Sequence, residues 1–96
     1  MRIIIAGWLS VVPEDRDEVV KAHEDIVRRA RNATGCLDLA ISADPIDPGR
    51  VNMFELWQSE DDLKSFQAVT KSPLKEGEVL GGDVQKHLIS SSGPPF

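Results

Sequence analysis

The sequence predicts an α+β domain in which four strands and two helices follow the order βαββαβ. Four segments have strand composition, two segments carry apolar residues at helical spacing, and turn residues separate them. Right-handed crossovers then give a four-stranded antiparallel sheet with both helices on one face, the ferredoxin-like arrangement. We expect residues 1–90 to form this domain, and residues 91–96, which lack any periodicity, to be a mobile tail.

The first expected strand, from Arg2 to Val12, is apolar on both faces. Alternation separates its side chains into two sets, which are Ile3, Ile5, Gly7, Leu9 and Val11, and Ile4, Ala6, Trp8, Ser10 and Val12. Such a strand needs cover on both sides, and helices supply it on one side only. In so short a chain a second subunit is the natural cover for the other side. We therefore expect a homodimer formed through the open face of the sheet.

The first expected helix begins at Pro13, because proline is tolerated in the first turn and the acids that follow favour the positive end of the helix dipole. Its inward residues recur at helical spacing and include a histidine: Val19, Val20, His23, Ile26, Val27 and Ala30. The helix ends near Gly35, since glycine readily takes the left-handed conformation that closes helices. His23 should therefore face the sheet.

The second expected strand, Cys36–Ala43, alternates between two faces. Leu37, Leu39 and Ile41 oppose Cys36, Asp38, Ala40 and Ser42. Prolines and a glycine in residues 44–49 end this strand before the third begins.

The third expected strand, Arg50–Trp57, carries the most distinctive side chains. Val51, Met53, Glu55 and Trp57 share one face, opposite Asn52, Phe54 and Leu56. An acid and an indole thus lie side by side on a mostly buried surface. A buried carboxylate is costly unless it is paired, so Glu55 has either a raised pKa suited to proton transfer or a structural partner such as an arginine or a backbone donor.

The second expected helix runs from Ser59, whose hydroxyl can cap it, to Val69, and it carries Leu63 and Phe66 inward. Ser72-Pro73 ends it, and an irregular helical turn is expected over residues 73–80. Gly81-Gly82 is expected to form a turn before the fourth strand, Asp83–Ser90.

Composition excludes several classes of function. The net charge of −5 and the lack of a clustered Lys/Arg stripe argue against nucleic-acid binding. No apolar run is long enough to span a bilayer, so no membrane segment is expected. The single Cys36 excludes an internal disulfide and a cysteine-based zinc site, and His23 and His87 stand alone on different elements, so no metal site is expected. The reducing cytoplasm fits this cysteine usage.

Two stretches within the βαββαβ order resemble one family. They are Gly35-Cys36-Leu37 and, above all, Glu55-Leu56-Trp57-Gln58-Ser59-Glu60-Asp61-Asp62-Leu63. With this topology they resemble the antibiotic biosynthesis monooxygenase family, from about Ile3 to Ser90. The resemblance implies a dimeric α/β barrel with a pocket between the sheet and the helices of each subunit. Family activities include oxidation of aromatic substrates by O₂ without metal or flavin, haem degradation, and isomerisation of small metabolites.

The chain departs from the family pattern at two points. Many members carry a histidine nine residues after the motif tryptophan, where this chain has Phe66. Haem-degrading relatives use a histidine in this region as the iron ligand, so haem degradation is disfavoured. The chain also has no tyrosine, which removes a polar group that aromatic-oxidising relatives can use to bind phenolic substrates.

The resemblance and the residues together predict a cofactor-independent monooxygenase that oxidises a small aromatic or enolisable substrate with O₂. The candidate catalytic residues are Trp57, His23 and Glu55, and the candidate substrate-binding residues are Phe66, Leu63 and Met53. This hypothesis requires Trp57 and His23 to face each other across a shared cavity. The alternatives are a non-oxidative isomerase or cyclase that uses the same base, and a non-enzymatic ligand-binding domain in which these side chains only pack.

Overall fold

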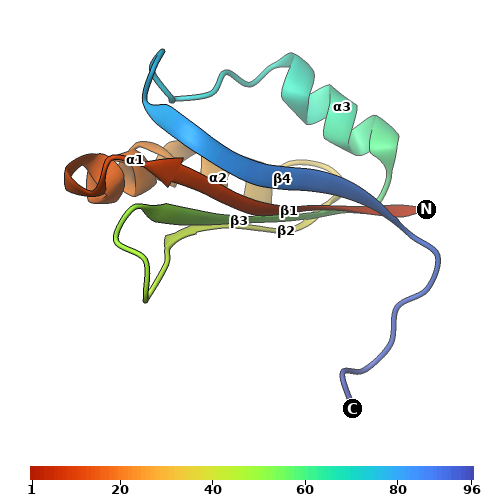
Figure 1. The fold of residues 1–96 in the computed structure, drawn as a ribbon. Coiled ribbons are helices and arrows are strands. Elements are labelled where there is room, and N and C mark those ends of the chain that lie inside the picture. The colour runs from red at the N-terminus through yellow and green to blue at the C-terminus, as the bar shows by residue number, and fades with distance from the viewer.

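The computed structural model describes all 96 residues and has the expected four-stranded antiparallel sheet (Figure 1). The elements in chain order are β1 (Arg2–Val11), the 3₁₀ turn η1 (Pro13–Asp15), α1 (Arg16–Ala22), α2 (Glu24–Arg31), β2 (Cys36–Ala43), β3 (Arg50–Trp57), α3 (Glu60–Ala68) and β4 (Val79–Ile89). The strands lie in the order β2-β3-β1-β4, and every neighbouring pair is antiparallel. The α+β ferredoxin-like fold is therefore confirmed.

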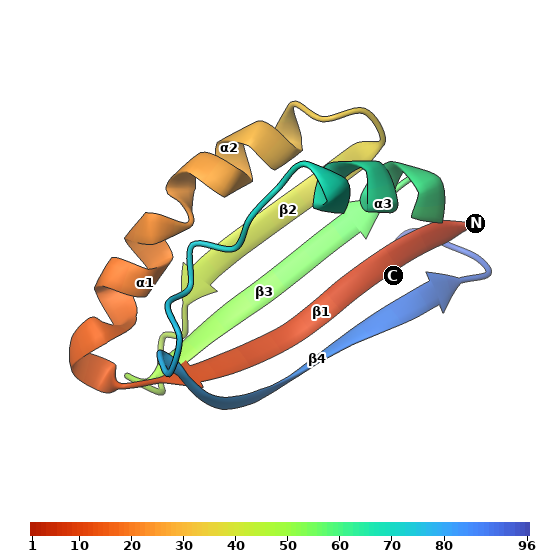
Figure 2. The same cartoon turned by 90° about the horizontal axis from the view of Figure 1, so that it is seen from above.

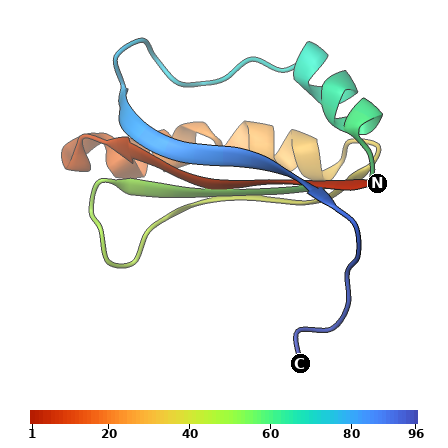
Figure 3. The ribbon, with the colours of Figure 1, turned by 45° about the vertical axis from the view of Figure 1, so that its right-hand side comes forward.

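All helices lie on one face of the sheet, and the other face is bare (Figures 1 and 3). Seen from above, α1 and α2 follow the β2 side of the sheet, and α3 crosses near the end of β3 (Figure 2). None of the helices combines the length and the hydropathy that a membrane span requires. Residues 91–96 contain no helix or strand and run away from the sheet on its bare side (Figure 3).

Burial confirms the faces expected for β1 and β3. Ile3 pairs with Trp57 and Leu9 pairs with Val51, so the alternating set of β1 that contains Ile3 lies on the same side of the sheet as the set of β3 that contains Trp57. The main core cluster consists of Ile3, Ala30, Leu39, Trp57 and Leu63. A second cluster of Val11, Val19 and Val51 lies at the other end of the sheet.

The first helix is broken at His23 and is not continuous as expected. The His23 amide donates to the carbonyl of Val20, three residues back, at 3.1 Å. The carbonyl of Val19, which a regular α-helix would pair with this amide, instead contacts the His23 ring at 2.7 Å. The imidazole thus takes the place of one helical hydrogen bond, and this substitution divides α1 from α2.

The expected alternation fails at Leu37 because β2 contains a bulge. Cys36 pairs with Trp57 and Asp38 pairs with Leu56, which leaves Leu37 as the additional residue. Leu37 is consequently exposed, and Cys36 packs against the main core cluster in its place. The prediction that Leu37 and Leu39 share one face of this strand is therefore wrong.

The β4 strand begins earlier than expected and includes Gly81-Gly82, which are not a turn. Strands β1 and β4 approach closely here, since a Cβ on Gly82 would lie 2.4 Å from the Trp8 carbonyl oxygen, and Gly82 has a φ of 153°. Residues 70–78 form neither helix nor strand, so the helical turn expected at 73–80 is also wrong. This segment crosses back over the sheet between α3 and the start of β4 (Figure 2).

Candidate active site

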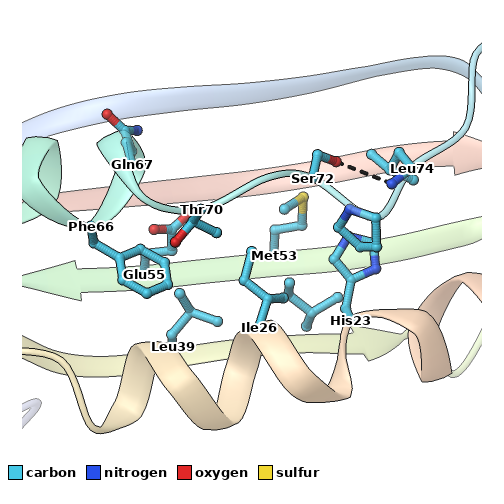
Figure 4. Close-up of a pocket in the computed structure, with 12 residues that line it drawn as sticks. His23, Ile26, Leu39, Met53, Glu55, Phe66, Gln67, Thr70, Ser72 and Leu74 are labelled. Carbon is cyan, nitrogen blue, oxygen red and sulfur yellow. Dashed lines mark hydrogen bonds between the residues drawn. The ribbon is translucent and has the colours of Figure 1, made fainter.

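A cavity of about 220 Å³ lies between the sheet and the elements above it (Figure 4). Its walls are mainly apolar, and the hydrophobic lining residues are Ile26, Leu39, Ile41, Met53, Phe66 and Leu74. Its polar lining residues are His23, Glu55, Gln67, Thr70 and Ser72. This composition is typical of a small-molecule site, in which a few polar groups orient a ligand held by apolar contacts.

Glu55 is the only acidic residue of the lining. It projects from β3 and is partly buried, and its Oε1 accepts a hydrogen bond of 3.0 Å from the indole Nε1 of Trp57. Burial raises the pKa of Glu55, and the hydrogen bond from Trp57 opposes this rise. The partner of the carboxylate is thus a neutral indole, and neither an arginine nor a backbone donor is bonded to it.

Trp57 lies behind the cavity and is not part of its wall. Its side chain is fully buried, and its ring contacts the Phe66 ring with centroids 5.4 Å apart and planes inclined by 37°. Phe66 lines the cavity, and Trp57 does not. The expected arrangement, with Trp57 and His23 facing each other across a shared cavity, is therefore not formed. Leu63 is likewise a core residue and does not line the cavity.

His23 lines the cavity from the break between α1 and α2, and it is 4% exposed. Its Nδ1 lies 2.7 Å from the Val19 carbonyl oxygen, which can only accept, so Nδ1 carries the hydrogen. In the neutral ring Nε2 is then a free acceptor, able to take a proton. Figure 4 shows His23 beneath Ser72 and Leu74, with Glu55 and Phe66 toward the other end.

The structure brings together four of the six candidate residues, His23, Glu55, Met53 and Phe66, at one cavity. Sequence reasoning missed Thr70, whose Oγ1 is buried without a hydrogen-bond partner. The signal for it was its spacing, because Thr70 follows Phe66 by four residues and Leu63 by seven, which continues the line of inward residues just past the end of α3. No group of three His, Cys, Asp or Glu side chains is arranged to hold a metal ion.

A family model for antibiotic biosynthesis monooxygenases matches residues 2–72. The chain belongs to the antibiotic biosynthesis monooxygenase family. The match to this family runs from β1 through α3 and includes every lining residue named above except Leu74. A search of curated protein sequences found no significant match.

Solved structures share the fold of this family member at low sequence identity. A proposed antibiotic biosynthesis monooxygenase from Deinococcus radiodurans has 20% identity and a TM-score of 0.84, with 98% of each chain covered. A second proposed antibiotic biosynthesis monooxygenase, from Nitrosomonas europaea, has 14% identity and a TM-score of 0.77, covering 95% of this chain and 100% of its own. A conserved protein from Methanosarcina mazei has 17% identity and a TM-score of 0.76, with 91% of each chain covered.

Proposed function

We propose that the protein is a cofactor-independent monooxygenase that oxidises a small aromatic or enolisable molecule with O₂. Membership of the antibiotic biosynthesis monooxygenase family supports the reaction class. The observation that carries the proposal is the placement of Glu55, a carboxyl of raised pKa in an otherwise mainly apolar cavity. A raised pKa makes a carboxylate a stronger base, and apolar walls keep water away from a reactive carbanion.

The reaction proceeds from the substrate's own electrons. A base removes a proton from a carbon next to a carbonyl or phenolic group, and the resulting carbanion passes one electron to O₂. The two radicals combine to a peroxide anion, which takes up the proton to become a hydroperoxide and then loses water to leave the carbonyl. The net change is CH₂ + O₂ → C=O + H₂O, so no external reductant is required. Glu55 is the leading candidate for the base, and His23, through Nε2, is the second.

The cavity volume favours a small substrate. At about 220 Å³ it lies below the range of about 300–1,000 Å³ that is usual for ligand pockets. A molecule with one or two rings fits this size better than a large polycyclic molecule. Met53 and Phe66 would contact the ring faces, since both side chains line the cavity.

We further propose that two copies pair through the bare face of the sheet in the cytoplasm. Apolar side chains gather on this face without a helix over them: Ile4, Ala6, Trp8, Ala40, Phe54 and Leu56. Sheet faces of this composition need an apolar partner, which a second copy supplies with a matching surface.

The experiment measures oxygen consumption by the purified protein with a panel of small hydroxylated aromatics and enolisable ketones, without added flavin or metal. Glu55→Gln should abolish uptake of O₂, and Glu18→Gln, a matched change at an exposed position, should not. If His23→Gln abolishes uptake and Glu55→Gln does not, His23 is the base. Absence of O₂ uptake with every compound would refute the proposal.

A non-oxidative isomerase or cyclase is the second candidate function. The same observation favours it, because removal of a proton by Glu55 would also start an enolisation. Turnover that persists at full rate without O₂ would select this candidate.

A further inference from the structure

Thr70 has a buried hydroxyl that nothing in the chain binds. Thr70 lies beyond the end of α3 and lines the cavity, and its Oγ1 has no hydrogen-bond partner. Buried hydroxyl groups are usually satisfied, because loss of their hydrogen bonds to water is unfavourable. A donor left free in a cavity wall is therefore available to a molecule that occupies the cavity.

The same cavity contains a second group with an unused position. The Trp57 indole donates a hydrogen bond to Oε1 of Glu55, and no side chain or backbone group is hydrogen-bonded to Oε2. Figure 4 shows Glu55 and Thr70 together at the Phe66 end of the cavity. This end thus offers one free hydroxyl donor beside one free carboxyl oxygen.

The other polar lining residues are less suited to bind a ligand in this way. Ser72 is exposed, and its Oγ already accepts a hydrogen bond from the Leu74 amide at 3.2 Å. Gln67 is exposed to solvent, where water competes for its amide. His23 lies toward the opposite end (Figure 4). Thr70 and Glu55 are therefore the pair best placed to act on one part of a ligand.

We propose that Thr70 and Glu55 form a single subsite for the oxygen-bearing end of the substrate, an inference that rests on the proposed function. Thr70 Oγ1 donates a hydrogen bond to a carbonyl oxygen, and Oε2 of Glu55 takes a proton from the adjacent carbon. The electron pair of the broken C–H bond forms the enolate, whose negative oxygen Thr70 stabilises, and the proton stays on Glu55.

This subsite defines the substrate class. The substrate has one or two rings and carries an acidic C–H on the carbon next to a carbonyl group, or it is the equivalent phenol. The ring body lies against the apolar wall, which includes Ile26, Leu39 and Met53. A hydrocarbon of the same shape would fit this wall but would leave Thr70 unsatisfied, so the hydroxyl should discriminate between the two molecules.

A matched pair of probes tests the subsite: 1-indanone, a two-ring ketone with an acidic C–H, and indane, the same skeleton without the oxygen. Calorimetry without O₂ should show that the wild-type protein binds 1-indanone more tightly than indane. Thr70→Val should weaken the binding of the ketone but not of indane, and should thus reduce this preference about three- to tenfold, as expected for one hydrogen bond. Thr70→Ser should keep the preference. Thr34→Val, the same change at the exposed second threonine, should leave it unaltered.

Two readouts separate a binding role from a packing role. Thr70→Val should keep or raise the melting temperature, because it removes a buried hydroxyl without a partner, whereas loss of packing would lower it. In the oxygen assay Thr70→Val should raise KM or lower kcat for ketones that the wild type oxidises.

The possible failures are distinguishable. Equal affinity of the wild type for the two probes, including no binding of either, would overturn the subsite. So would a Thr70→Val variant with unchanged preference and unchanged kinetics in a protein that consumes O₂, and the proposed function would then stand alone. A preference that depends on Thr70 in a protein that consumes no O₂ would support the subsite for ketone binding and refute the oxidation.

Discussion

Trp57→Phe removes the single hydrogen bond that holds Glu55 and leaves every residue of the cavity wall in place. The indole Nε1 is the only donor to the carboxylate, and the Trp57 side chain is fully buried beneath Phe66. Phenylalanine retains an aromatic ring but has no donor. The variant therefore tests whether a residue outside the cavity controls the acid inside it.

The expected loss of stability has two parts. A hydrogen bond to a charged group contributes about 1.5–3 kcal/mol to the free energy of unfolding. The smaller ring also leaves part of a buried site empty, which adds to the cost. The sum is about 2–4 kcal/mol, and for a domain of this size each 1 kcal/mol lowers the melting temperature by about 4–8 °C. The pKa of Glu55 should rise further, because the hydrogen bond from Trp57 is the group that lowers it.

A double-mutant cycle with Glu55→Gln separates the charge-dependent part of the hydrogen bond from the change in ring size, because the glutamine carbonyl can still accept from the indole but carries no charge. The cycle compares the free energies of unfolding of the wild type, both single variants and the double variant, from urea denaturation at one protein concentration. We expect a coupling energy of about 1 kcal/mol that shrinks as the pH falls through the pKa of Glu55, since a protonated carboxyl accepts less strongly. Equal destabilisation by Trp57→Phe in both backgrounds at every pH would show that the charge of Glu55 adds nothing to the hydrogen bond.

Three further predictions concern Glu55, the bare sheet face and β1. Burial raises the pKa of Glu55 in the folded state, so the contribution of Glu55 to stability is present below about pH 4.5 and is lost as the pH rises through the folded-state pKa. In thermal melts the Glu55→Gln variant should therefore become more stable relative to the wild type as the pH rises. A difference in stability that does not change with pH would contradict the burial of this acid. Trp8→Glu should convert the proposed dimer to a folded monomer in analytical ultracentrifugation, since Trp8 is outside the core; an unchanged dimer would place the interface elsewhere. Gly7→Ala should lower the free energy of unfolding in urea by about 3 kcal/mol or more, because the new Cβ would lie 1.9 Å from the Asp83 carbonyl oxygen at a φ of 155°. Gly81→Ala is the control, since a Cβ there meets nothing within 4 Å. Similar losses of stability in both variants would refute the close approach of β1 and β4.

The sequence was sufficient to predict the topology and the faces of β1 and β3. Period-two alternation decides which side of the sheet each residue occupies, and the register that pairs Ile3 with Trp57 preserves it. Alternation could not reveal the bulge at Leu37, because an additional residue in one strand depends on the partner strand as well as on local composition.

The sequence predicts which side of the sheet each candidate residue occupies, but it does not predict which of these residues reaches the cavity. Glu55 and Trp57 share the helix side of β3 as expected, but which of them reaches the cavity depends on the position of the Phe66 ring on α3. The helix break at His23 could not be predicted from the sequence for a similar reason. A helical periodicity continues through a residue whose ring replaces one backbone hydrogen bond, so apolar spacing alone cannot detect it.

The segment of residues 70–78 is held in place differently from the strands. Its hydrogen bonds are local, such as Thr70 to Gln67 and Glu78 to Lys75, and its main attachment to the body of the protein is the packing of Leu74 against the Val11, Val19 and Val51 cluster. Displacing it breaks no bond between strands. Local opening of this segment and unfolding of the sheet therefore have separate barriers, and backbone amides in this segment should exchange with deuterium well before those of the central strands.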